Sequence, residues 1–326
     1  MNPQPVSLGS SPSNQPVTRL YGPNGTPCPN FNESIKEWLE GTRSVRGHQP
    51  PAAFSGTRTL YSAAVESAVL TGLSRKDAHR LALSNMTTML FKIDLSAEIE
   101  AKWGPELFNS AGFRSSRTQA IAKNIGENFI NVIVFALASL LANQDEVLVD
   151  KGLPPWLKKS LTLKRTIPLK TGDREIRIPI EGDATIFSRN DHSNAILISA
   201  KTRLKEVFHI GTMWKIIFDM LGDDYCKQKW GLEQDGTDSV KEMLYVFATA
   251  DMVATGGARS QGADVERALP RNLIAMDASF FDYVFVSKTG IAHVENSITL
   301  GTRGALFHEL GCLVDLIEQK FGITLG

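Results

Sequence analysis

The chain has 326 residues, of which 42% are hydrophobic and 21% are charged, as is usual for a soluble globular protein. This length allows one large domain or two, with enough apolar residues for a substantial core. The 35 basic and 35 acidic residues cancel. That balance argues against a strongly electrostatic, non-specific nucleic-acid binder, and it leaves room for a local basic groove.

The three cysteines, Cys28, Cys226 and Cys312, stand far apart, and none belongs to a CxxC pair. Their odd number and wide spacing argue against a disulfide framework or a zinc ribbon and fit a reducing cytoplasm. The N-terminus lacks a basic-then-apolar signal, and the longest apolar run, residues 132–141, is too short to span a bilayer. We therefore expect a cytoplasmic protein that has no membrane partner.

The first 30 residues are rich in Pro, Ser, Asn and Gly and hold too few apolar side chains to offset the entropy of ordering. We expect a disordered arm over residues 1–30. The pattern then becomes helical to about residue 144. We assign residues 31–115 to a helical N-terminal region and residues 116–326 to a larger core.

The helical region carries several start signals. Asn32 can cap its first helix, and Ser74 with Asp77 three residues later resembles a capping box. Ser96 can cap a further short helix. The longest predicted helix covers residues 116–142, and its second half is apolar nearly all round. That half must therefore be buried.

After residue 155 the hydrophobic period changes to two. Residues 161–169 and 175–180 predict one hairpin, and residues 184–187 and 195–198 predict a second. The rest of the chain predicts a helix at 60–70, a helix at 205–221, a polar loop at 222–238, strands at 244–249, 272–276 and 283–287, a flexible connection at 256–262 and a helix at 303–321. This order predicts an α/β (α+β) fold in which helices flank a mixed central β-sheet.

The second hairpin brings polar chemistry to one end of that sheet. Asp183 opens its first strand, and Ser199 and Lys201 close its second. In an antiparallel pair with a short turn, the start of the first strand lies beside the end of the second, so Asp183 and Lys201 would meet. An Asp after Gly is also a common turn residue, and a Lys at a strand end is commonly a solvated one.

A carboxylate and an ammonium in this place suit metal-assisted attack on a phosphodiester. Asp183 and the backbone carbonyl of Ala200 would hold Mg²⁺, which prefers oxygen ligands and keeps several waters. The metal lowers the pKa of a bound water, and Lys201 orients or deprotonates that water. The polar run that ends at Glu206 is well placed to meet a nucleic-acid backbone and base edges.

The order Gly-Asp183, strand, turn, strand, Ser199-Ala-Lys201 and then Lys205-Glu206 resembles the active-site signature of type II restriction endonucleases of the PD-(D/E)XK nuclease superfamily. It is similar in particular to the subgroup in which Ser-x-Lys replaces the usual acidic residue before the lysine. The resemblance implies a restriction-endonuclease-like core, Mg²⁺ as cofactor, double-stranded DNA as partner and a bacterial or archaeal cytoplasm.

The resemblance also implies individual roles. Asp183 would bind the metal, Lys201 would assist the attacking water, and Ser199 stands where the second acid usually lies. Lys205 and Glu206 match the first two members of a basic-acidic-basic triplet that reads bases in this subgroup. A lysine can donate to guanine O6 or N7, and a glutamate can accept from cytosine N4.

Two departures from the subgroup concern the triplet and the second acid. Val207 replaces the third, basic member of the triplet. The subgroup recovers its missing acid from the following helix, about a dozen residues beyond the lysine, where this chain has no carboxylate. Glu206 is the nearest acid and Asp219 the next. Glu127, at the polar-to-apolar changeover of the long helix, is either a surface residue or, as the resemblance implies, a glutamate that the helix before the sheet brings toward the metal. The second acid is therefore expected to be either Glu206 or Glu127.

We expect a type II restriction enzyme, that is, a sequence-specific double-stranded DNA endonuclease that hydrolyses phosphodiester bonds with Mg²⁺. Palindromic sites are read by two-fold symmetric proteins, so we expect a homodimer. Arg203 and His209 join Lys205 and Glu206 as candidate DNA contacts. The alternatives are a DNA-binding protein with a decayed nuclease core and a structure-directed DNA repair nuclease.

Overall fold

The fold rests on a computed structural model of the chain. It describes residues 17–48, 54–92, 97, 100, 104–110, 112, 114–202, 208–234, 240–250, 252–255, 258–261, 272–289, 293–302 and 306–326. The helices are α1 (Phe31–Glu40), α2 (Ser55–Leu70), α3 (Arg75–Ser84), α4 (Met86–Lys92), α6 (Pro105–Asn109), α7 (Arg114–Leu140), α8 (Pro155–Ser160), α9 (Phe208–Gly222), α10 (Asp224–Trp230), α12 (Asn272–Phe280) and α13 (Cys312–Phe321). The strands are β1 (Val147–Lys151), β2 (Thr162–Ile167), β3 (Arg174–Pro179), β4 (Ala184–Ser188), β5 (Ala195–Lys201), β6 (Glu233–Gln234), β7 (Leu244–Thr249), β8 (Met252–Thr255), β9 (Ala258–Gln261), β10 (Val284–Val286), β11 (Val294–Glu295) and β12 (Phe307–Glu309).

A mixed seven-stranded sheet forms the centre of the protein, in the order β1-β4-β5-β7-β10-β12-β11. The β1-β4 and β4-β5 pairs are antiparallel, whereas β5-β7, β7-β10, β10-β12 and β11-β12 are parallel. Residues 195–200 of β5 and 245–249 of β7 are buried throughout, as expected for strands that helices cover on both faces. The predicted α/β fold with helices around a mixed sheet is confirmed.

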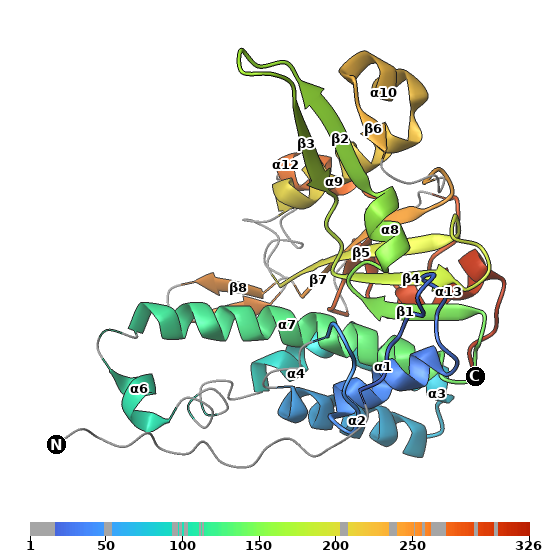
Figure 1. Cartoon of the computed structure of the whole chain (residues 1–326). Helices are drawn as coiled ribbons and strands as arrows, with labels where there is room; N and C mark the ends of the chain where they lie inside the picture. The colour runs from blue at the N-terminus through green and yellow to red at the C-terminus, as the bar shows by residue number, and fades with distance from the viewer. Residues whose placement is uncertain are drawn as a thin grey trace.

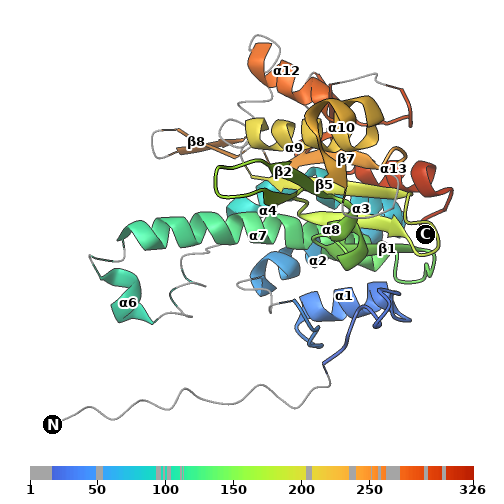
Figure 2. The same ribbon diagram turned by 45° about the horizontal axis from the view of Figure 1, so that its top comes forward.

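Helices cover the two faces of this sheet (Figures 1 and 2). On one face α7 packs against β5, and its apolar half is fully buried around Phe129, Ile133 and Leu137. On the other face α9 crosses β7 at Gly211. A Cβ added to Gly211 would lie 3.1 Å from the ring of Phe281 and 3.3 Å from that of Phe247, so the missing side chain is what permits this close approach.

The helix α7 also meets the length and composition criteria for crossing a membrane over Gln119–Leu140. This segment is longer than the apolar run that the sequence suggests. About two thirds of its most apolar window, 65%, is buried inside the protein. Core helices of soluble proteins pass the same criteria, so the segment is weak evidence for a membrane span.

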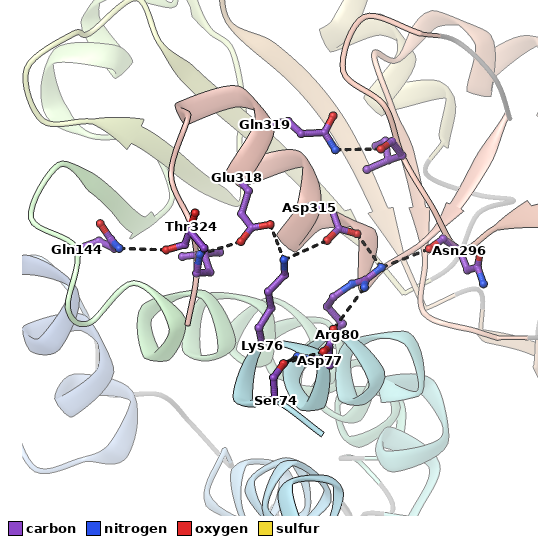
Figure 3. Close-up of polar contacts among 12 residues, drawn as sticks. Ser74, Lys76, Asp77, Arg80, Gln144, Asn296, Asp315, Glu318, Gln319 and Thr324 are labelled. Atoms are coloured by element: carbon purple, nitrogen blue, oxygen red, sulfur yellow. Dashed lines mark hydrogen bonds and ion pairs between the residues drawn. The ribbon is translucent and has the colours of Figure 1, made fainter. Parts of the chain in front are cut away.

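The helical N-terminal region and the C-terminal helix are joined by an ionic cluster (Figure 3). Lys76 Nζ lies 2.5 Å from Glu318 Oε2, and Arg80 Nη2 lies 2.7 Å from Asp315 Oδ2. Burial raises the pKa of the Asp315 carboxyl, and Arg80 and Lys76 oppose that shift. Because α3 and α13 share these partly buried pairs, the predicted helical region is tied to the core.

Residues 17–30 differ from the disordered arm that their composition predicts. Leu20 is only 2% exposed, and Tyr21 donates a 2.7 Å hydrogen bond to Asp150 Oδ2 on β1. The ring of Tyr21 also packs edge-on against Phe31. These contacts hold the segment against the buried strand β1. The prediction of a disordered arm is therefore wrong for residues 17–30. Residues 1–16 lie outside the described part of the chain.

Asn32 does not cap the first helix, which begins at Phe31. It is 2% exposed, and its side chain links the C-terminal end of α7 to β1. Its Nδ2 donates to the carbonyls of Leu141 and Val147 at 2.8 Å each, and its Oδ1 accepts from Val149 N at 3.0 Å. Ser74 is confirmed as the N-cap of α3, because its Oγ accepts from Asp77 N at 3.0 Å, while its hydroxyl donates to the Asp77 carboxylate at 2.7 Å.

Four local assignments from the sequence are wrong. The expected strand at 272–276 is the start of helix α12, and the expected loop at 222–238 contains α10, which Asp223 caps by accepting from the backbone N–H of Tyr225. The flexible connection at 256–262 contains β9, which pairs with β8. The last helix begins at Cys312 because β12 first adds to the sheet beside β10. Ser96 lies outside the described residues.

A buried histidine makes the stability of this fold depend on pH. His79 on α3 is 3% exposed, and its Nδ1 lies 2.8 Å from Tyr61 Oη on α2. Burial lowers the pKa of this imidazole from 6.5 to about 4, and the charge of Arg75 acts in the same direction. The unfolded chain therefore takes up this proton at a higher pH than the folded chain does.

The free energy of unfolding should fall as pH drops from about 6.5 to about 4, by roughly 3 kcal/mol from this group. Urea unfolding between about pH 7 and about pH 4.5 measures the slope. The variant His79→Gln should show a flatter dependence. An unchanged slope in that variant would assign the pH dependence to other groups.

Candidate active site

The β4-β5 hairpin places Asp183 beside the end of β5. The pairs Ala184↔Ile198 and Phe187↔Ala195 fix the register. Asp183 N donates to Ile198 O at 2.8 Å, and Asp183 O accepts from Gly152 N at 2.9 Å. The backbone of Asp183 is thus held from both sides, between β5 and the segment that follows β1.

The carboxylate of Asp183 meets two donors from β5. Its Oδ2 accepts from Ala200 N at 2.8 Å and from Lys201 Nζ at 2.9 Å. The side chains of Asp183 and Lys201 are 35% and 28% exposed, respectively. The structure therefore brings together the two residues that the sequence pairs, at the C-terminal end of β5, where both side chains are partly exposed to solvent.

The backbone carbonyl of Ala200 shares this environment. The N–H and C=O of one strand residue point to the same side of the strand, and Ala200 N–H points at Asp183. One carboxylate and one carbonyl fit Mg²⁺, which accepts few protein ligands and keeps several waters. In the parts of the chain that the structure describes, no cluster of three or more His, Cys, Asp or Glu side chains offers a richer metal site.

Gly182 lies close to the loop between β1 and α8. A Cβ at that position would lie 2.9 Å from Leu153 Cδ2, the far end of a flexible side chain, so a small residue there would require Leu153 to shift. Leu153 packs against the core.

Tyr245 on β7 belongs to the site and is not apparent from the sequence. Its hydroxyl donates to Glu181 O at 2.9 Å. Burial raises the pKa of Tyr245, the nearby charge of Asp183 raises it further, and a hydrogen bond with Ser199 acts in the opposite direction. Tyr245 and Ser199 are therefore buried polar residues next to the Asp183 carboxylate, with exposures of 0% and 4%.

Glu127 on α7 lies at the same end of the sheet, where it forms an ion pair with Lys151 of β1. Its Oε2 is 2.7 Å from Lys151 Nζ. Lys151 pairs with Ala184 across the β1-β4 ladder, and paired residues share a face of a sheet. Ala184 in turn pairs with Ile198, and successive residues of β5 alternate between faces. Lys151 and its partner Glu127 therefore lie on the α7 face of the sheet, opposite to Ser199 and Lys201.

The first turn of α9 returns to this edge. Gly211 packs on Phe247, whereas Phe218 packs on Tyr245, so α9 runs antiparallel to β7 and begins near the end of β5. His209 in that first turn is 55% exposed, and its Nδ1 lies 2.6 Å from Asp277 Oδ2 on α12. Asp277 is a buried carboxylate on α12 that faces His209.

The later part of α9 points to the opposite end of the sheet. Lys215, in the neighbourhood where the resembled subgroup carries its acid, is 4% exposed and lies 2.5 Å from Asp219 Oδ1 and 3.3 Å from Asp282 Oδ2. Asp282 also accepts from Tyr245 N at 2.7 Å. Asp219 is thereby placed away from Asp183.

A cavity of about 570 Å³ opens at this opposite end, lined by Lys215, Asp219 and Asp282 among others. It is separate from the edge that carries Lys201.

Three candidate DNA contacts, Arg203, Lys205 and Glu206, lie outside the described residues.

Comparisons with known proteins give a distant likeness to solved structures. No family model matches the chain, and no curated protein matches it. A solved structure described as a complex of the restriction endonuclease PspGI with substrate DNA aligns over 84% of this chain and 96% of its own. The TM-score is 0.40 and the sequence identity is 13%.

Removal of the Tyr245 hydroxyl should weaken the fold at this site. The variant Tyr245→Phe leaves the carbonyl of Glu181 without its donor, and we expect the free energy of unfolding to fall by about 1 kcal/mol. Urea unfolding measures the change. Tyr225→Phe is the matched control, because Tyr225 is 67% exposed and should give no change. Equal stability of both variants would mean that the Tyr245 bond contributes nothing.

Proposed function

We propose that the protein is an Mg²⁺-dependent endonuclease that hydrolyses phosphodiester bonds of double-stranded DNA at a specific sequence and acts as a homodimer. The observation that carries the proposal is the 2.9 Å contact between Lys201 and Asp183 at a solvent-accessible edge of the sheet. The Asp183 carboxylate is held by one backbone donor, Ala200 N, and the main chain of Asp183 is fixed by Ile198 O and Gly152 N, so the partner of Lys201 is held in place. The resemblance of Ser199-Ala-Lys201 to restriction endonucleases supports the same function.

The residues divide the chemistry between them. Asp183 and the carbonyl of Ala200 would hold Mg²⁺, which supplies a water of lowered pKa and neutralises charge on the phosphate. Lys201, steered by Asp183, orients the attacking water and donates to a phosphate oxygen as negative charge develops there. Tyr245 holds the carbonyl of Glu181 and thereby keeps the approach to Asp183 in place.

The second acid is assigned to Glu206. Glu127 is paired with Lys151 on the α7 face, and Asp219 is paired with Lys215 at the other end of β7. Glu206 comes five residues after Lys201 in the sequence and is the remaining candidate for this role.

A DNA-binding protein with a decayed nuclease core is the second candidate. The observation that favours it is Lys215, which occupies the part of α9 where a catalytic acid is expected and is engaged with Asp282. Incubation of plasmid DNA with Mg²⁺ separates the two functions. Discrete fragments support the endonuclease, and DNA that is retarded in a gel but uncut supports the binder.

Lys201→Ala should lower DNA cleavage by at least about 100-fold, because the group that orients the water is lost. Binding measured with Ca²⁺ in place of Mg²⁺ should change little. Plasmid cleavage and gel retardation measure the two properties. Lys36→Ala on α1, where Lys36 pairs with Glu33, is the control and should cleave normally. Normal cleavage by Lys201→Ala would remove this residue from the mechanism.

Glu127→Gln should keep cleavage within about threefold, whereas Glu206→Gln should lower it by about 100-fold at unchanged sequence choice. Rates across a range of Mg²⁺ concentrations, with sequencing of the product ends, provide the measurement. The reverse pattern would make Glu127 the second acid. Relaxed sequence choice in Glu206→Gln, without loss of rate, would make Glu206 a base-reading residue.

A further inference from the structure

The charges of this neutral chain are unevenly distributed. Residues 158–177 contain seven basic residues and two acidic ones, Asp173 and Glu175, which gives this segment a net charge of +5. The rest of the chain therefore has a net charge of −5. We call the segment from α8 through β3 the basic hairpin. Its basic residues are Lys158, Lys159, Lys164, Arg165, Lys170, Arg174 and Arg177.

The basic hairpin stands outside the central sheet. β2 and β3 pair with each other and, through β2, with the two-residue strand β6, in a sheet of their own (Figure 1). Every residue of β3 except Ile176 is exposed, and Ile178 remains 44% exposed. A two-stranded ribbon that buries so little apolar surface is marginal by itself. Core packing therefore does not explain its length.

The pairing of β2 with β3 places cations close together. Lys164 lies opposite Arg177 in the register, and like charges directly opposite each other destabilise a sheet. Glu175 offsets part of this through a 2.6 Å contact with Arg177, and Glu233 on β6 lies opposite Lys164 on its other side. On the other face, Arg165 and Arg174 pair with the apolar residues Ile176 and Ile167 and are exposed. A polyanion bound along the ribbon would relieve this repulsion.

The base of the hairpin is fastened to the candidate site. Ile180 N donates to Leu161 O at 3.1 Å and closes the hairpin. The next residue, Glu181, is held by Tyr245, and Asp183 follows two residues later. The ribbon and the Asp183 carboxylate are thus consecutive parts of one anchored segment.

We propose that the basic hairpin binds the phosphate backbone of double-stranded DNA and holds the duplex against the edge formed by Asp183 and Lys201. This rests on the proposed function for its substrate. A two-stranded ribbon fits the major groove of B-form DNA. Contacts to phosphates fix position and orientation without reading sequence, so the hairpin contributes affinity while other segments contribute specificity.

The test is the salt dependence of DNA binding by the full-length double variant R165Q/R174Q. Both side chains are exposed, so the fold should be kept. With a labelled duplex of about 30 base pairs and Ca²⁺ in place of Mg²⁺, we expect Kd to rise roughly tenfold. The slope of log K against log salt should become shallower by about 2, equally for unrelated sequences.

Two further double variants serve as controls. R46Q/R75Q removes the same charge from exposed positions of the N-terminal region and should bind as the unchanged protein does. R165K/R174K keeps the charge on the hairpin and should retain most of the affinity, since a phosphate contact needs a cation rather than a fork of donors.

An unchanged Kd and salt slope in R165Q/R174Q would overturn the inference, as would equal weakening in R46Q/R75Q or tighter binding of double-stranded RNA. Cleavage with Mg²⁺ is read separately. A protein that binds through the hairpin but does not cut supports the inference and overturns the nuclease. A protein that cuts while R165Q/R174Q binds normally overturns only the inference.

Discussion

The register of the β4-β5 pair is the constraint on which the candidate site depends. Alternation along a strand places Ser199 and Lys201 on one face and Ala200 on the other, and the pair Ala184↔Ile198 brings Asp183 level with them. A slip by one residue would turn Lys201 toward α7 and separate it from the carboxylate. Residues 184–187 are buried on both faces, so a slip would have to repack the close-packed core on either side of the sheet. Core packing thereby holds two polar side chains in position.

The parallel half of the sheet extends this arrangement. β7 lies beside β5 in the same direction, so its side chains stand next to those of β5, and Tyr245 reaches the segment before β4. Helix α9 then runs back over β7, which divides its polar residues between the two ends of the sheet. His209 in the first turn pairs with Asp277, whereas Lys215 pairs with Asp282. The direction of this helix therefore decides which of its residues lie at the same end of the sheet as Lys201.

Sequence reasoning succeeds where the signal is local. The β4-β5 hairpin, the helix α7 and the cap at Ser74 all follow from periodicity or from residues three positions apart. It fails where distant segments decide the outcome. Residues 272–276 have no clear period and become helical against α9, and Tyr245 joins the site only through parallel pairing. Glu206, the proposed second acid, lies outside the described residues, so its placement remains a prediction.

Asn32 illustrates a consequence for the order of folding. Its amide satisfies carbonyls of Leu141 and Val147, which lie 109 and 115 residues further along the chain. During synthesis the N-terminal segment leaves the ribosome long before these partners exist, and α1 cannot dock until β1 has been made. Closing so long a loop is entropically costly. The residues of α1 are therefore made early but are among the last to reach their final contacts, because they dock on an edge strand that is synthesised after them.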